Sequence, residues 1–284
     1  MRRAADFPEA DRFTGFLSLS MENKNGRTVI RDAYHTGAFK ISRPFDPDGS
    51  GQVCIGLLNP GGGYVDGDRY MMRVELKPGA ELLLTTQSAT KIYRTPRDEV
   101  VSRAEIRLGA RAVLEYLPDP VIAYGQARYR QHTVVRMDRG ASFVSADIFT
   151  PGWSRTATLF AYERLQNSLE VYVDDELVLC DRLRIVPDGS ESGLGIFEGY
   201  THYGSLLVIH ERGTEAELER LHGLLASGLS GTDVKFGVTS LLAPGLMLRI
   251  LARSTGDVLK AFGIGCDFVR TRWLGKKPVR LRKY

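Results

Sequence analysis

The dipeptide Gly-Ala recurs three times in this chain at nearly constant spacing, at Gly79-Ala80, Gly109-Ala110 and Gly140-Ala141. The intervals are 30 and 31 residues, and the flanking positions agree as well. Apolar and polar residues alternate before each pair, and an apolar stretch follows it. This period-two pattern is typical of a strand with one buried face, so each unit is predicted to be a β rung, hairpin-like or coil-like, that turns at its glycine.

A rung that buries only one face is not stable alone, so the three units are predicted to stack or wrap into a solenoid-like or sandwich-like body. The 30 glycines of the chain exceed the usual share of about 7% and indicate many tight turns. Apolar patterning predicts further strands, at residues 15–21, 28–34, 52–58, 168–173, 177–184, 205–210 and 246–252.

Helices are predicted only in the last third of the chain. Residues 215–226 carry leucines on one helical face, and Thr214 with Glu217 forms the pattern of a capping box. Residues 257–273 form a second amphipathic pattern, which Ser254 or Thr255 can cap. The expected fold is therefore mainly β, with β-helical, solenoid-like stacked strands and about two helices. We expect one domain over residues 1–284, with a β body at about 12–210 and an α+β portion at about 211–284.

The formal charge of +4 comes largely from the end of the chain, where Asp267 is the one nearby acid. Such a run either meets an acidic partner or is simply a solvated basic end, and both interpretations remain open. The basic residues are Arg270, Arg272, Lys276, Lys277, Arg280, Arg282 and Lys283.

The cysteines Cys54, Cys180 and Cys266 are odd in number and widely spaced, which favours neither a disulfide framework nor a zinc site. Residues 1–16 lack the apolar centre of a secretory signal. The most apolar stretch, 240–252, is interrupted by polar and turn residues and falls short of the roughly 20 residues of a membrane span. We therefore expect a cytoplasmic protein without a membrane partner.

The glycine cluster of Gly61, Gly62, Gly63 and Gly67 resembles a phosphate loop only superficially, because Asp68 and an arginine follow where lysine and a hydroxyl are needed. The spacing of acids there does not match a calcium loop either. The five histidines show no metal-ligand spacing, and no nucleophile elbow or cysteine-protease signature is present. The sequence thus offers no recognisable catalytic machinery, and the glycines are predicted to form a strained turn.

Two carboxylates fall where burial is expected. Asp147 lies in the apolar run 143–149, and Asp181 follows the apolar stretch 177–180. A buried acid costs several kcal/mol unless it is paired or solvated. Each is therefore either part of a structural ion pair, for instance Asp181 with Arg182 or Arg184, or a functional group.

The segments N-P-G-G-G-Y-V-D-G-D (59–68) and T-T-Q-S-A-T-K-I-Y-R (85–94) resemble the urease accessory protein D family, also called the H type. The likeness continues through residues 114–120, 127–131, 169–170 and 181–183 and covers most of the chain. The signature positions are Pro60, Gly61, Gly62, Gly67, Asp68, Thr85, Thr86, Gln87, Ala89, Thr90, Lys91, Tyr93 and Arg94.

The resemblance implies a non-catalytic assembly chaperone with a β-helical body and two helices. Such a protein binds the F-type accessory protein, recruits the G-type GTPase through it, and docks on apo-urease. Nickel is then expected in transit through an internal passage, with no tightly bound cofactor, and Asp147 and Asp181 correspond to acids of that passage. Scattered carboxylates, hydroxyls and water suit transit, because a Cys/His cluster would hold the ion.

Two other functions stay open from the sequence. A β-helical carbohydrate-active enzyme needs two carboxylates facing across a groove, a role that Asp147 and Asp181 could imitate. A nucleic-acid binder, suggested only by the basic end, would bind with steep salt dependence. We expect neither a nucleic-acid partner nor an enzymatic activity.

Overall fold

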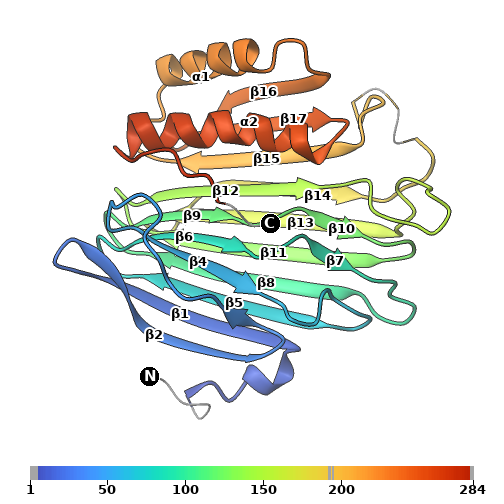
Figure 1. Ribbon diagram of the computed structural model, residues 1–284, viewed down its shortest axis with the longest axis horizontal. Coiled ribbons are helices and arrows are strands. Elements are labelled where there is room, and N and C mark those ends of the chain that lie inside the picture. The colour runs from blue at the N-terminus through green and yellow to red at the C-terminus, as the bar shows by residue number, and fades with distance from the viewer. Residues whose placement is uncertain (1–5, 191–192, 194, 282–284) are drawn as a thin grey trace.

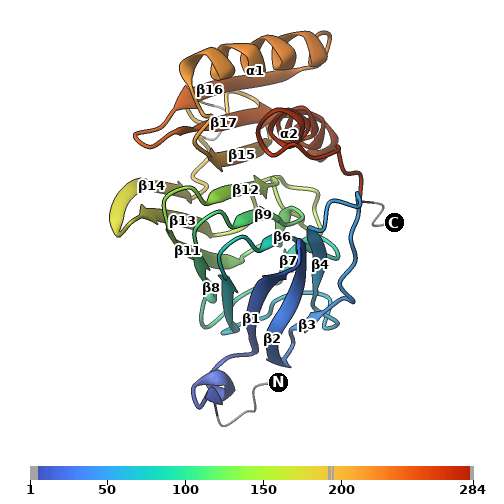
Figure 2. The same ribbon diagram turned by 90° about the vertical axis from the view of Figure 1, so that its left-hand side faces the viewer.

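Two β-sheets face each other and form the body of the protein (Figures 1 and 2). The computed structural model describes residues 6–190, 193 and 195–281. The first sheet has the order β14-β13-β11-β8-β5-β1-β2. Its strands are β1 (Gly15–Lys24), β2 (Arg27–Gly37), β5 (Arg69–Leu76), β8 (Val100–Leu108), β11 (Arg128–Met137), β13 (Arg164–Val173) and β14 (Glu176–Ile185).

The second sheet has the order β16-β17-β15-β12-β9-β6-β4-β3. Its strands are β3 (Lys40–Ile41), β4 (Val53–Leu58), β6 (Glu81–Thr86), β9 (Val113–Leu117), β12 (Ser142–Phe149), β15 (His202–Ile209), β16 (Val234–Ser240) and β17 (Gly245–Ala252). Two short strands, β7 (Thr90–Ile92) and β10 (Val121–Ala123), pair with each other beside this sheet.

Successive turns of the chain stack as parallel strands, so the body is a solenoid. In the first sheet β1, β5, β8, β11 and β13 run parallel to one another, and in the second sheet β4, β6, β9 and β12 do the same. The inward side chains of both sheets share one large apolar core. The predicted mainly β, solenoid-like fold is confirmed, and the rungs are coils rather than hairpins.

The corner between the two sheets corrects the predicted alignment of the repeat. The ladder of β5 and β8 places Gly79 level with Arg111, not with Gly109. The three residues at this corner position, Gly79, Arg111 and Gly140, all have positive φ, at 70°, 58° and 82°. Gly109 is needed for another reason, because a Cβ there would lie 2.9 Å from Pro78. The misalignment of two residues leaves every side chain on its predicted face, since strands alternate with period two.

Two helices cover the outer face of the second sheet where it extends beyond the solenoid (Figure 1). They are α1 (Glu215–Gly228) and α2 (Thr255–Phe268), and α2 continues into a π-helical turn at Val269–Trp273. The Oγ atom of Ser254 accepts a hydrogen bond from the backbone N–H of Asp257, so the predicted cap of the second helix is confirmed. None of the helices in the described part of the chain is long and apolar enough to cross a membrane.

The predicted capping box at α1 is wrong. Thr214 makes no side-chain capping bond, and the carboxylate of Glu217 instead accepts two hydrogen bonds from Arg272, at 2.9 and 2.8 Å, and one from Trp273 Nε1 at 3.1 Å. A bidentate, charge-assisted pair is stronger than a bond to a backbone N–H. Arg272 accordingly holds the pKa of Glu217 down at about 2.

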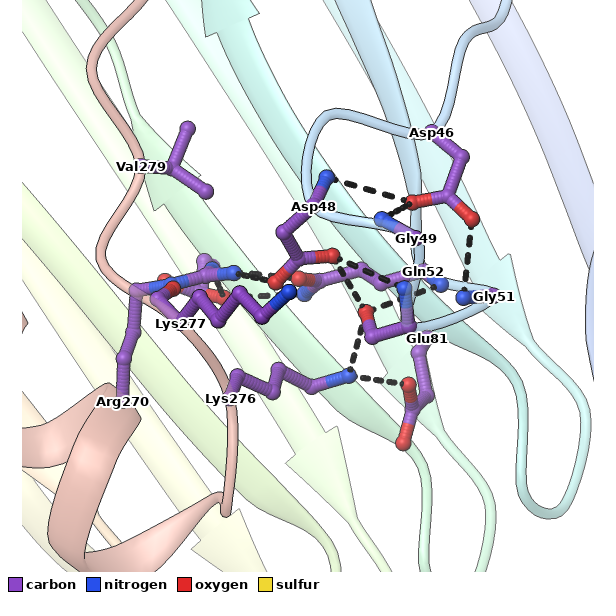
Figure 3. A network of polar contacts seen from close by, with 12 residues as sticks. Asp46, Asp48, Gly49, Gly51, Gln52, Glu81, Arg270, Lys276, Lys277 and Val279 are labelled. Carbon is purple, nitrogen blue, oxygen red and sulfur yellow. Dashed lines mark hydrogen bonds and ion pairs between the residues drawn. The ribbon is translucent and has the colours of Figure 1, made fainter.

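Two cations of the basic C-terminal segment, Arg270 and Lys276, are buried (Figure 3). At these two positions the segment is neither a solvated end nor a free surface for an acidic partner. Arg270 is only 2% exposed and donates hydrogen bonds to Glu115, to Gln52 Oε1 at 3.1 Å and to Asp48 Oδ2 at 2.6 Å. Lys276 donates to Glu81 Oε2 at 2.5 Å. For Arg270 and Lys276, the two expectations of an acidic partner or a solvated end were both wrong, because their counter-ions come from distant parts of the chain.

The outer members of the same charge run behave differently. Arg280 pairs with Asp267 at the surface, and Arg272 pairs with Glu217 as described above. Arg282 and Lys283 lie outside the described residues. The run thus divides into a buried clasp, formed by Arg270 and Lys276, and an exposed remainder.

Two acceptors of the clasp, Asp48 and Gln52, belong to the loop between β3 and β4, whereas Glu115 lies on β9 and Glu81 on β6. The loop is held by hydrogen bonds of its own. Asp46 accepts hydrogen bonds from the backbone N–H groups of Asp48, Gly49 and Gly51, at 3.3, 2.8 and 2.9 Å (Figure 3). Burial alone would raise the pKa of Asp48, but hydrogen bonds from Ser50 and the charge of Arg270 outweigh it and lower the pKa. The loop therefore presents an ionised carboxylate to the guanidinium.

Gly140→Ala tests the corner. Positive φ costs a residue with a Cβ about 1–2 kcal/mol, so we expect the free energy of unfolding to fall by that amount. No neighbouring atom lies within 4 Å of the added methyl group, which leaves backbone strain as the cause. Gly223→Ala in α1 is the matched control: it is equally unhindered, and its helical backbone should raise stability by up to about 1 kcal/mol. If urea unfolding shows that both variants are destabilised, or that both are stabilised, this account is contradicted.

Arg270→Met tests the clasp. Removal of the cation leaves Glu115 and Asp48 buried without their partner, so we expect a loss of about 3–5 kcal/mol of unfolding free energy. Arg280→Met, at a pair whose arginine is 67% exposed, should cost no more than about 1 kcal/mol. Chemical denaturation measures the loss of unfolding free energy in both variants. Equal losses would show that burial does not make the Arg270 pairs more important for stability than the exposed Arg280 pair.

Candidate functional site

A group of polar side chains lies between the two sheets, inside a core that is otherwise apolar. Asp147 on β12 points inward from the second sheet and accepts hydrogen bonds from Gln131 Nε2 at 2.9 Å and from Asn167 Nδ2 at 3.1 Å. The two amides occupy paired positions on the parallel strands β11 and β13 of the first sheet. The carboxylate is thus held between the sheets by donors from the opposite side.

The environment of Asp147 is unusual for a carboxylate. Desolvation raises its pKa, the hydrogen bonds from Gln131 and Asn167 oppose that rise, and the negative charge of Asp181 adds to it. In addition, the Oδ1 atom of Asn167 is buried and has no hydrogen-bond partner. A buried acceptor without a donor is costly, and this one lies on the side chain that already contacts the carboxylate.

A cavity of about 40 Å³ adjoins this group. It has room for roughly two or three water molecules. Its lining is mixed, and the polar members include Thr86, Tyr116, Asp119, Tyr129, Gln131 and Asp147. Burial raises the pKa of both Tyr116 and Tyr129, so their phenols are neutral and supply oxygen atoms without charge.

Asp181 lies at the edge of the first sheet, on β14, with its side chain 17% exposed. Its Oδ1 atom accepts a hydrogen bond of 2.5 Å from Arg249 Nη2 on β17, so the ion pair joins the two sheets. The predicted pairing with Arg182 or Arg184 is wrong, because adjacent strand residues alternate in direction and both arginines line the outer face. The structure therefore brings Asp147 and Asp181 into one neighbourhood, close enough for their charges to interact.

A groove of about 690 Å³ opens beside the Asp181–Arg249 pair. It arises because the first sheet ends at β14, whereas the second sheet continues through β15, β17 and β16. Leu183, Tyr203, Phe236, Arg249 and Leu251 are among the residues that line it. A wide, mostly apolar groove thus lies beside this ion pair at one edge of the body.

The two signature segments lie side by side on consecutive coils. Tyr64 forms a β-bridge with Ile92, and the backbone N–H groups of Tyr64 and Tyr93 donate across it, each at 2.8 Å. Asp68 is a structural residue: its carboxylate accepts hydrogen bonds from Thr14 Oγ1, the N–H of Val65 and the hydroxyl of Tyr70. The first segment therefore forms a turn that is hydrogen-bonded to the second segment.

The glycines of the first segment fit the predicted strained turn. Gly62 and Gly67 have φ values of 76° and 78°, in the region that favours glycine. A Cβ on Gly63 would lie 2.6 Å from the ring of Tyr93. The backbone N–H of Gly61 is satisfied by Asn59 Oδ1 at 3.0 Å. The cluster is thus explained by local geometry alone.

The second segment contributes to the interior and to the surface. The hydroxyl of Thr85 donates to the carbonyl of Leu117 at 2.6 Å, and the hydroxyl of Thr86 donates to Asp119 Oδ2 at 3.0 Å. Thr86 and Thr90 both line the small cavity. Of the other signature residues, Ala89, Lys91 and Tyr93 are partly buried, whereas Pro60, Gln87 and Arg94 are exposed.

A sequence model described as "UreD urease accessory protein" matches residues 14–283. The chain belongs to the UreD family. Its relatives named urease accessory protein UreD include one from Lachnoclostridium phytofermentans, 43% identical over 273 residues, which covers 96% of this chain and 99% of the relative. Others come from Bacillus sp. (strain TB-90), 43% identical with 95% and 99% covered, and Arthrobacter sp. (strain FB24), 41% identical with 97% and 96% covered. The family resemblance seen in the sequence is confirmed.

In this UreD-family chain, sequence patterns missed three residues of the site: Gln131, Asn167 and Arg249. Gln131 and Asn167 stand in ordinary alternating strands, and nothing local marks them as partners of Asp147. Arg249 offered a weak signal, since it is a charge inside the apolar strand β17. No group of three or more His, Cys, Asp or Glu side chains that could hold a metal ion occurs within residues 6–190, 193 and 195–281.

The raised pKa of Asp147 predicts a pH effect. The unfolded carboxyl loses its proton near the usual value of 3.8, whereas the folded one keeps it to higher pH. The folded state therefore loses stability as the pH rises above about 4. Urea unfolding should show that the stability of Asp147→Asn, relative to wild type, increases as the pH rises above about 4. Parallel pH profiles would contradict this expectation.

Proposed function

We propose that this chain is a non-catalytic urease maturation factor that works in the cytoplasm. It binds the F-type accessory protein, recruits the G-type GTPase through that partner, and docks on apo-urease. Nickel is its cargo and passes to the urease active site through the polar interior. Membership of the UreD family, whose relatives are named urease accessory proteins, supports the maturation role.

The observation that carries the transport part of this proposal is the line of oxygen atoms inside the solenoid. Asp181 at the open edge interacts electrostatically with Asp147, which is hydrogen-bonded to its two amide partners and lines the small cavity. Carboxylate, amide and hydroxyl oxygens bind a divalent cation without the tight grip of a Cys/His cluster. Such ligands suit an ion that has to leave again.

The geometry gives less support to a carbohydrate-active enzyme. Glycoside hydrolysis needs two carboxyl groups that flank a sugar and an open cleft to admit it. Asp147 faces a cavity of only about 40 Å³, and the carboxylate of Asp181 is engaged by Arg249. Turnover on a panel of polysaccharides would be needed to revive this alternative.

Asp147→Ala and Asp181→Ala test the proposal. Co-expressed with F-type protein, G-type GTPase and urease subunits, both variants should still capture these partners, while the nickel content of the purified urease falls severalfold. Removing either carboxylate deletes a ligand of the passage but no surface that we assign to docking. Metal analysis and co-purification give the two readouts.

Glu176→Ala is the matched control, because Glu176 is an exposed acid at the start of the same strand as Asp181. It should leave both capture and nickel content unchanged. A folded wild-type chain that captures none of the partners would refute the maturation role. Normal urease nickel content with both aspartate variants would refute the passage and leave the maturation role standing.

A further inference from the structure

The ion pair between Asp181 and Arg249 stands at the boundary between the groove and the polar interior. Arg249 is the one exposed residue of β17, and its side chain, 56% exposed, lines the groove. Asp147, Ser205 and Arg249 occupy consecutive paired positions across β12, β15 and β17. Asp147 in turn lines the inner cavity. A row of polar residues therefore leads from the open edge toward the buried carboxylate.

We propose that Arg249 is a built-in competitor for the metal, a resident cation that occupies Asp181 and must be displaced before a divalent ion can bind there. The inference rests on the proposed function, since it concerns the mouth of the same passage. It assigns the arginine a positioning and regulatory role rather than a ligand role. The consequence is that Asp181, at the entrance to the passage, binds the divalent ion weakly.

The chemistry of the pair supports competition. A guanidinium that donates to Asp181 Oδ1 at 2.5 Å fills one of the sites at which a metal would be coordinated. Its positive charge also repels an approaching divalent cation at short range. The pair as a whole is neutral, so it presents no net negative charge to the ion until the arginine moves away.

The surroundings allow that movement. More than half of the Arg249 side chain is exposed, and the groove of about 690 Å³ offers space for an alternative position. The guanidinium can be hydrated in the groove after it leaves Asp181, which is itself only 17% exposed. Deeper inside, the carboxylate of Asp147 and the unpartnered Oδ1 atom of Asn167 offer oxygen ligands that no cationic side chain occupies.

The test measures Ni²⁺ binding to the isolated full chain, purified without a histidine tag, by equilibrium dialysis at low ionic strength. Arg249→Gln should bind Ni²⁺ about tenfold or more tightly than wild type, because one repelling charge is removed and Asp181 is released. Arg249→Lys keeps the charge and should stay within about threefold of wild type. Arg182→Gln, on the next residue of β14 to Asp181 but on the outer face, is the matched control and should change nothing.

The double variant Arg249→Gln/Asp181→Asn locates the effect. If the double variant loses the increase in Ni²⁺ affinity that Arg249→Gln shows, the proposal is supported. If the increase persists without Asp181, or if Arg249→Gln shows no increase, the proposal is overturned. The measurement needs no urease, so its result is separate from the proposed function. If Arg249→Gln binds Ni²⁺ more tightly but urease matures normally with Asp147→Ala, the competition by Arg249 is supported and the nickel passage is refuted.

Discussion

The parallel ladder between successive coils is the constraint on which the rest of this structure depends. Each strand pairs with the equivalent strand of the next coil, so inward side chains stay inward along the whole body. That regularity places Gln131 beside Asn167 and turns both toward Asp147 on the opposite sheet. A one-residue change in register would point the amides at solvent and leave the carboxylate buried without donors. The chemistry of the interior is therefore a product of register rather than of any local motif.

The buried clasp performs a second task, because it fixes the helical layer to the solenoid. Arg270 leaves the π-helical turn after α2 and reaches Glu115 on the outer face of the second sheet and Asp48 in a distant loop. Removing a cation and two carboxylates from water is costly, and the cost is offset only when every charge is paired and hydrogen-bonded. Here Gln52 completes the network by donating to Glu115 and accepting from Arg270. A buried network with few alternative arrangements favours one placement of α2, and α2 packs on β15 and β17, the strand that carries Arg249.

Period-two patterning predicted the strands and the solenoid because alternation is a local property of the chain. The same pattern misaligned the repeat, since the residue that adopts positive φ at the second corner is Arg111 and composition points instead to Gly109. Asp147 could be recognised as an acid in an apolar run, but its donors lie 16 and 20 residues away on other strands. The basic end was misread for a related reason: Arg270 finds its counter-ions 155 and 222 residues earlier in the chain. Burial of a charge depends on partners that only the folded chain brings together.

The unequal length of the two sheets links these features. If both sheets ended at the same coil, the inward face of β17 would be covered, and Arg249 would have to be buried or replaced by an apolar residue. Because the first sheet stops at β14, the inward face of β15 and β17 is open at the groove, and a charged residue is tolerated there. Asp181 lies on the last strand of the shorter sheet, and solvent still reaches 17% of its side chain. Beyond the last strand of the shorter sheet the enclosed core gives way to an open, mostly apolar groove, and the Asp181–Arg249 ion pair lies at that boundary.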